Sequence, residues 1–177
     1  SVAAAVEELG RAAVEWKLDG IRIQVHKQGD DVRMWTRGLN EIHIPSVADT
    51  VRTFPADSLV LDGEVLGIHE DGTPVAFQDT VAQESSVTPF FFDLIHVDGR
   101  DLLDTPLEER RDELARIAGA AHVPGEIVDD VAAAEAVQAA ALGMRHEGVM
   151  VKAADSPYQA GRRGMTWRKV KPVHTLS

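Results

Sequence analysis

The strongest restriction on the fold comes from a short turn between two predicted strands, written Lys17-Leu18-Asp19-Gly20-Ile21-Arg22. An apolar approach precedes this stretch, and the alternating run from Ile21 to Val25 follows it, so the pattern predicts a strand on each side. Asp-Gly is typical of a tight turn. The lysine that ends the first strand is therefore presented to a cleft.

A lysine in this position can act as a nucleophile if it loses its proton near neutral pH. The pKa of a lysine in solution is about 10.4, and neighbouring cations or desolvation must lower it. Arg22 is the first such cation along the chain. Taken alone, however, a lysine and an aspartate near a turn more often form a solvated surface pair, so the rest of the chain has to decide between the two interpretations.

Five further motifs follow in order: Thr36-Arg37-Gly38, Leu61-Asp62-Gly63-Glu64, Phe90-Phe91-Phe92-Asp93, Glu147-Gly148-Val149-Met150-Val151-Lys152 and Trp167-Arg168-Lys169-Val170-Lys171. The ordered set resembles nucleotidyltransferase motifs I, Ia, III, IIIa, IV and V of ATP-dependent DNA ligases, most closely the bacterial and archaeal ones. The resemblance runs from Glu15 to Lys171. It implies an α+β fold, similar to ATP-grasp, in which two antiparallel β-sheets pack around a nucleotide cleft with flanking helices.

The resemblance also implies an activity and a set of site residues. Lys17 would attack the α-phosphate of ATP, form a covalent lysyl-AMP and pass the AMP to the 5′-phosphate of nicked double-stranded DNA. Glu15 would take the adenine amino group, and Phe92 would stack on the base. The residues implied to contact ribose, phosphates or other parts of ATP are Arg22, Arg37, Glu64, Glu147, Lys152, Arg163, Lys169 and Lys171. Glu64 and Glu147 are also the implied Mg²⁺ ligands.

Some of these positions have a second interpretation on their own residues. A carboxylate within a buried strand is costly to desolvate, so Glu64 either faces a ligand or pairs with a core arginine. Arg37 could simply end a surface strand. Lys169 and Lys171 share one face of the last strand, where they could bind a polyphosphate or protect a solvated sheet edge.

The charge balance argues against a general nucleic-acid binder. The net charge is −11, whereas sequence-independent affinity for DNA comes from lysine and arginine. Only five of the 18 basic residues are lysine, and four of the five lie in the motifs. Action on DNA therefore requires basic residues concentrated in one cleft, or other domains that hold the DNA.

Length and composition favour one globular domain over residues 1–177. The absence of cysteine excludes disulfides and thiolate metal sites. No apolar run of about 18 residues predicts a membrane span, and no basic-then-apolar leader is visible, so we expect a cytoplasmic protein without membrane contact.

The remaining elements follow from caps, breakers and periodicity. We expect helices over 1–12 ending at Gly10, from Pro45 to before Pro55, over 105–118 with Thr105 as N-cap, and over 130–142 stopped by Gly143. We expect a hairpin over 14–36 with its turn at 28–31, and strands over 59–68, 90–95, 147–152 and 167–171. We assign no catalytic or binding role to the helices over 105–118 and 130–142. The connection over 77–88 is short for the family, so residues could be missing there.

Ligases of this family continue into an OB-fold domain, and many carry a DNA-binding domain ahead of the catalytic one. We therefore expect an adenylation domain alone, which would be a poor complete ligase. RNA ligases and capping guanylyltransferases share the Lys-x-Asp-Gly core, and NAD-dependent ligases share the lysine. A noncatalytic nucleotide-binding module is the alternative from another class. The departures from the family are the short connections and Gly38 followed by Leu-Asn-Glu.

Overall fold

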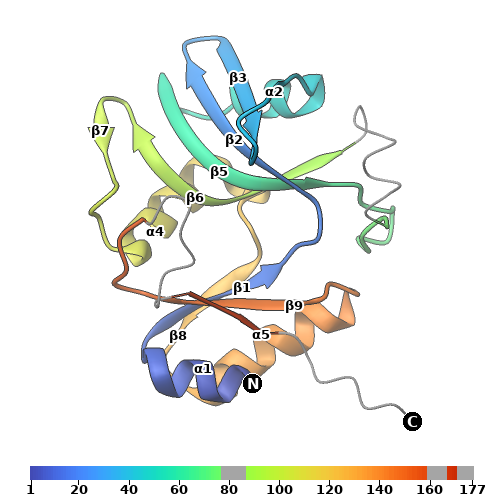
Figure 1. Ribbon diagram of the computed structural model, residues 1–177, viewed down its shortest axis with the longest axis vertical. Helices are drawn as coiled ribbons and strands as arrows, with labels where there is room; N and C mark the ends of the chain where they lie inside the picture. Colours follow the sequence, from blue (N-terminus) through green and yellow to red (C-terminus); the bar gives the residue numbers. More distant parts are fainter. Residues whose placement is uncertain (77–86, 159–166, 171–177) are drawn as a thin grey trace.

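Two antiparallel β-sheets of different size form the fold (Figure 1). The computed structural model describes residues 1–76, 87–158 and 167–170. Within these ranges the small sheet has four strands in the order β10-β9-β1-β8, and the large sheet has six in the order β4-β3-β2-β5-β6-β7. The predicted α+β class with two antiparallel sheets is confirmed.

The elements have the following bounds. The strands are β1 (Ala12–Lys17), β2 (Ile21–Gln28), β3 (Asp31–Thr36), β4 (Glu41–Ile42), β5 (Ser58–Leu66), β6 (Thr88–Val97), β7 (Arg100–Asp101), β8 (Gly125–Val128), β9 (Gly148–Ala153) and β10 (Trp167–Val170). The helices are α1 (Val2–Leu9), α2 (Pro45–Arg52), α4 (Leu107–Ala118), the short 3₁₀ helix η2 (Gly119–Ala121) and α5 (Val131–Gly143).

The turn after Lys17 carries the chain from one sheet to the other. β1 ends at Lys17 in the small sheet and β2 begins at Ile21 in the large one. The hairpin expected over 14–36 is therefore too long at its start: residues up to Lys17 belong to the other sheet, and the hairpin consists of β2 and β3 around a turn after Gln28. A Cβ on Gly20 would lie 2.2 Å from the carbonyl oxygen of Val65. Only glycine permits this close approach to β5, and it brings the turn against the large sheet.

Helices α1 and α5 cover one face of the small sheet and build its core with it (Figure 1). The side chains of Ser1 and Asp130 cap them by accepting from backbone amides; Asp130, expected as the first residue of its helix, is the cap that precedes it. Gly143 does not stop α5, because it is the last helical residue. The left-handed conformation falls on Arg145, with φ 64°.

Helices α2 and α4 pack against the large sheet, whose core includes Ile23, Met34, Leu61 and Phe91. The expected N-cap at Thr105 is wrong, since α4 starts at Leu107 and no side chain caps it. The amides of residues 107 and 108 donate instead to the backbone carbonyls of residues 156 and 154, at 2.9 and 2.8 Å. The segment after β9 thus replaces a side-chain cap.

Two strand predictions need correction. β8 was not expected, because four residues are too few to show an alternating pattern; it pairs with β1 from Ala12 to Glu15. β9 begins at Gly148, so Glu147 precedes the strand instead of belonging to it. No helix in the described ranges is both long and apolar enough to cross a membrane.

Candidate active site

A cleft of about 940 Å³ lies between the two sheets. Its walls come from β1, β2, β3, β5, β6, β9 and β10, so motifs far apart in the sequence meet here. The sequence-predicted residues that line it are Glu15, Lys17, Arg22, Arg37, Glu64, Phe92, Lys152 and Lys169. Arg163, Lys171 and the connection over 77–86 lie outside the described residues.

Lys17 enters the cleft from the end of β1. Its ammonium forms an ion pair with Glu147, whose side chain is 29% exposed against 16% for the lysine. The pair follows from the sheet register, because Lys17 lies opposite Gly148 in the ladder between β1 and β9. The structure therefore places a carboxylate at the amine.

Arg22 is held by the large sheet. Its Nη2 lies 2.7 Å from Oδ2 of Asp62, its Nε donates to Oδ1 at 3.2 Å, and this hydrogen bonding raises the pKa of Arg22. The hydroxyl of Tyr158 also donates to Oδ2 of Asp62, at 2.9 Å. Arg22, which was expected to be the first cation acting on Lys17, is thus paired with Asp62. Neither Tyr158 nor Asp62 was predicted to have a role in the site.

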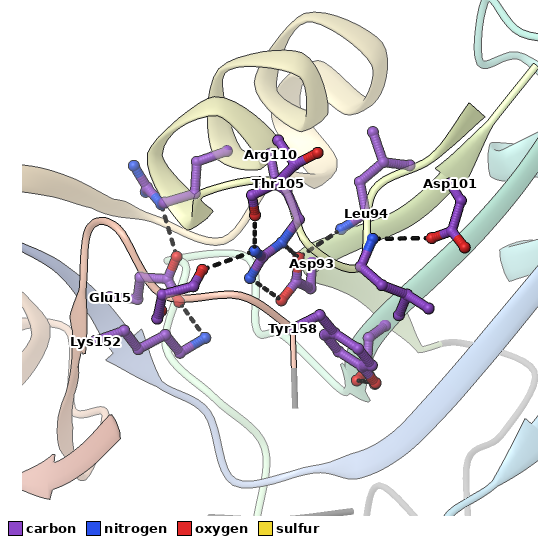
Figure 2. A network of polar contacts seen from close by, with 12 residues as sticks. Glu15, Asp93, Leu94, Asp101, Thr105, Arg110, Lys152 and Tyr158 are labelled. Atoms are coloured by element: carbon purple, nitrogen blue, oxygen red, sulfur yellow. Dashed lines mark hydrogen bonds and ion pairs between the residues drawn. The ribbon is translucent and has the colours of Figure 1, made fainter. Parts of the chain in front are cut away.

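Glu15 lies in a buried ionic network (Figure 2). Nε of Arg111 donates to its Oε2 at 2.7 Å, and Nζ of Lys152 lies 2.6 Å from its Oε1. Burial by itself would raise the pKa of Glu15, but the two cations outweigh it and hold this pKa below its ordinary value. Glu15 is thus a fixed, ionised acceptor in the wall of the cleft.

Lys152 was expected to contact phosphate, but its side chain is buried in this structure. Its side chain is only 2% exposed. Nζ lies 4.6 Å from the ring centroid of Phe92 and 4.1 Å from that of Trp167, distances at which a cation is attracted to the ring. The ammonium is therefore committed to Glu15 and to two aromatic rings, while Lys169 remains exposed on the cleft.

A second ion pair supports the same wall. Arg110 donates to Asp93 through Nε at 2.7 Å and Nη2 at 3.2 Å, and both side chains are fully buried. Figure 2 shows Arg110 between Asp93 and the carbonyl of Thr105. No catalytic or binding role was predicted for α4. The available signal was that two arginines, 110 and 111, occupy positions of the buried stripe between Leu107 and Leu114.

Phe92 and Glu64 face the cleft from the large sheet. The register between β5 and β6 shifts near Phe92, so that Asp62 pairs with Asp93 and Gly63 with Phe91. Phe91 is fully buried, whereas Phe92 is only partly so. Oε2 of Glu64 accepts from the amide of Gly20 at 3.2 Å, yet burial raises the pKa of Glu64 to about 7. A cation bound in the cleft would stabilise the ionised form of this buried carboxyl.

Replacing Glu64 with glutamine is expected to change the pH dependence of stability in the ligand-free protein. Between pH about 4.5 and 7 the folded state keeps a proton on Glu64 that the unfolded chain has lost. The free energy of unfolding therefore falls as pH rises through this window, by about 3 kcal/mol in total. Urea unfolding across this window, with chelator present, should show this fall in the wild type relative to Glu64→Gln. Parallel profiles would contradict the raised pKa.

Lys17 and Glu64 thus line a cleft between two antiparallel sheets, and Glu147 pairs with Lys17, which is the arrangement expected of a nucleotidyltransferase domain. The family model of the ATP dependent DNA ligase domain matches residues 1–171. The chain belongs to this family. It is 50% identical over 184 residues to a probable DNA ligase of Pseudarthrobacter chlorophenolicus, covering 99% of this chain and 36% of that protein. A probable DNA ligase of Beutenbergia cavernae is 51% identical, covering 93% and 34%.

Solved structures agree with this assignment. The ligase domain of LigD from M. tuberculosis superposes with a TM-score of 0.76 at 31% identity, covering 91% of this chain and 55% of that one. A mycobacterial DNA ligase D complexed with ATP and MES gives a TM-score of 0.73 at 30% identity, covering 89% and 53%. The chain spans about a third of the length of the curated relatives it matches.

Proposed function

We propose that this chain is the adenylation domain of an ATP-dependent DNA ligase and that Lys17 is its nucleophile. The observation that carries the proposal is the position of Lys17. It ends β1 at the crossing between the sheets, in the wall of a cleft that also receives Glu64, Phe92 and Lys169. Arg163 and Lys171 remain proposed ATP contacts on the resemblance alone.

In the proposed step the lone pair of Lys17 Nζ attacks the α-phosphorus of ATP. The N–P bond forms as the bond to the bridging oxygen breaks, and pyrophosphate leaves with that electron pair. Phosphoryl transfer requires positioning and charge stabilisation more than acid or base work. The carboxylate of Glu147 contacts Nζ and is placed to accept a proton that the amine must lose. Arg37 and Lys169 supply positive charge along the cleft.

The residues present fit a Mg²⁺ ion that shares its coordination with the nucleotide. Mg²⁺ prefers oxygen ligands and is usually held by one or two carboxylates together with substrate phosphates. Residues 1–76, 87–158 and 167–170 contain no group of three or more candidate metal ligands. We propose Glu64 and Glu147 as the protein ligands. When bound, the ion would stabilise the charge that develops on the phosphates.

The base-binding part of the cleft favours adenine in this proposal. Phe92 offers one face for stacking, and Glu15 offers an ionised acceptor for the N6 amine. Guanine would present its O6 acceptor to the same carboxylate. An unpaired polar contact of this kind costs about 1–3 kcal/mol, or roughly tenfold or more in affinity.

The later steps require more than this chain supplies. AMP would pass to the 5′-phosphate of nicked DNA, and the 3′-hydroxyl would displace it. With a net charge of −11, this domain needs help to hold DNA. We propose that an OB-fold domain and a DNA-binding domain of a longer, cytoplasmic protein provide it.

Radiolabelled nucleotide tests the proposal directly. In the presence of Mg²⁺, α-labelled ATP should give a covalent adduct that survives denaturation, and α-labelled GTP should give little or none. Labelling is measured on this chain and on the full natural protein, with intact-mass spectrometry to identify AMP. Equal labelling by both nucleotides would refute the adenine assignment, and no adduct in the full protein would refute the nucleophile.

A further inference from the structure

Both oxygens of the Glu15 carboxylate meet a cation, but only one of them is hydrogen-bonded. Nε of Arg111 donates to Oε2 at 2.7 Å, whereas Nζ of Lys152 lies 2.6 Å from Oε1 without the geometry of a hydrogen bond. Oε1 is buried and accepts no hydrogen bond from the described residues. A buried carboxylate oxygen without a donor is costly. Because Glu15 lines the cleft, Oε1 is the atom that a donor on a ligand would satisfy.

Arg111 reaches Glu15 from outside the motif strands. It lies on the buried stripe of α4, between Leu107 and Leu114, and its side chain is 8% exposed. Within the described ranges, the only hydrogen bond and the only ion pair of Arg111 are those to Glu15. The position of this arginine is therefore explained by the carboxylate and by nothing else that the structure describes.

The start of α4 is fixed to the segment that continues from β9. Two backbone amides of its first turn donate to carbonyls of this segment, and Nη1 of Arg110 donates to the carbonyl of Ser156 in the same segment at 2.9 Å. Since β9 itself carries Lys152, the helix and the strand hold their two cations in a fixed relation, one on each oxygen of Glu15 (Figure 2).

The ionisable groups around Glu15 keep its carboxyl charged. Burial would raise its pKa, but Lys152 and Arg111 outweigh this effect and lower it. The other ionisable groups that interact with this network are His122 and Asp93. Burial lowers the pKa of His122 to about 4, so this side chain is neutral near pH 7, and Asp93 has its own buried arginine partner. An ionised carboxylate only accepts hydrogen bonds, so this part of the cleft requires a donor.

We propose that Arg111 is a positioning residue that determines base specificity, because it fixes Glu15 with Oε1 left for a donor and so selects a purine with an amino group at position 6. The inference rests on the proposed function and extends it to a helix for which no role was predicted. Arg111 acts on the base through Glu15. Purine riboside triphosphate is the matching probe, because it lacks only the 6-amino group of ATP. The wild type should prefer ATP by about tenfold or more.

Two variants separate the hydrogen bond of Arg111 from its charge. Arg111→Met removes both, so the preference for ATP over purine riboside triphosphate should fall roughly tenfold. Arg111→Gln places an amide nitrogen at the position of Nε, so the hydrogen bond can persist although one cation is lost. Arg111→Lys keeps a cation and should retain most of the preference.

The pH profile of Arg111→Gln is the more specific measurement. With one cation removed, burial raises the pKa of Glu15, and the ionised acceptor is lost as pH falls through that pKa. The ATP preference should be close to the wild-type value at pH about 8 and fall towards pH about 5.5, whereas the wild type should stay constant. Glu64 titrates in the same range, but its effect is common to both nucleotides and cancels in the ratio.

Intact-mass spectrometry of the full natural protein follows adduct formation with each nucleotide, and calorimetry gives the two affinities. Arg116→Met is the control, because Arg116 lies on the same helix with its side chain 63% exposed and should not affect the ratio. In a Glu15→Gln background, Arg111→Met should change the ratio no further, since the effect of Arg111 passes through Glu15.

An unchanged ATP preference in Arg111→Met would overturn the inference. Equal losses with both nucleotides would do the same, because Arg111 would then have a structural role only. If Arg111→Met does not fold, the profile of Arg111→Gln decides, and a flat profile like that of the wild type would count against the inference. Absence of any adduct in the wild type would refute the proposed nucleophile, and the ratio of the two affinities would still test Arg111.

Discussion

Replacing Lys17 with arginine is expected to abolish the covalent AMP adduct while leaving the fold intact. Arginine keeps the positive charge and most of the side-chain length, so an ion pair with Glu147 can persist. The guanidinium, with a pKa above about 12, offers no free lone pair to the α-phosphate. Intact-mass spectrometry after incubation with ATP should show no added AMP, and circular dichroism with a thermal melt should match the wild type.

Lys169→Arg is the matched control for this experiment. Lys169 lines the same cleft and is exposed, but we propose it as a charge and not as the nucleophile. The Lys169→Arg variant should therefore still carry AMP, at a reduced rate. An adduct on the Lys17→Arg variant would place the nucleophile elsewhere, with Lys152 and Lys169 the next candidates, and peptide mapping would identify it.

Replacing Arg110 with alanine is expected to be the most destabilising single change that we propose. It would leave the Asp93 carboxylate fully buried without its partner, and burial already raises the pKa of this group. Removing one member of a buried pair costs about 3–5 kcal/mol. For a domain of this size the melting temperature should fall by roughly 6 to 20 °C, as calorimetry or a dye-based melt would show.

Arg116→Ala on the same helix is the comparison for Arg110. The Arg116 side chain is 63% exposed and pairs with Glu113 three residues earlier. An exposed pair of this kind contributes little, so the change in unfolding free energy should stay within about 0.5 kcal/mol. Equal melting temperatures for Arg110→Ala and Arg116→Ala would show that the buried pair of Arg110 and Asp93 does not stabilise this wall of the cleft.

Local signals in the sequence predicted most of the elements correctly. A helix begins within one residue of Asp130, Pro45 opens a helix, and alternation along Ile21 to Val25 gives a strand, because each depends on a few adjacent residues. The turn at Asp19-Gly20 was also predicted. The change from one sheet to the other at this turn was not predicted, because it depends on the close approach of Gly20 to β5, which is far away in the sequence.

The order of the motifs predicted that Lys17, Glu64, Phe92 and Lys169 would meet in one cleft, but not which charges would pair. Arg22 pairs with Asp62 across neighbouring strands, and Lys152 with Glu15 across another ladder. These pairs depend on register and on packing between segments far apart in the sequence. Arg111 was missed for the same reason, because its partner, Glu15, is 96 residues away.

The crossing after Lys17 divides the site between two supports. Lys17, the proposed nucleophile, belongs to the small sheet, whereas Arg22, Glu64 and Phe92 belong to the large one. Leu18, Leu66 and Val123 pack together next to this crossing, so we expect this apolar cluster to fix how far the Lys17 amine extends toward a bound phosphate. In the proposed reaction, shortening one of these side chains is expected to misalign the amine without removing any charged group, so the alignment of attack depends on apolar packing as well as on the charged residues of the site.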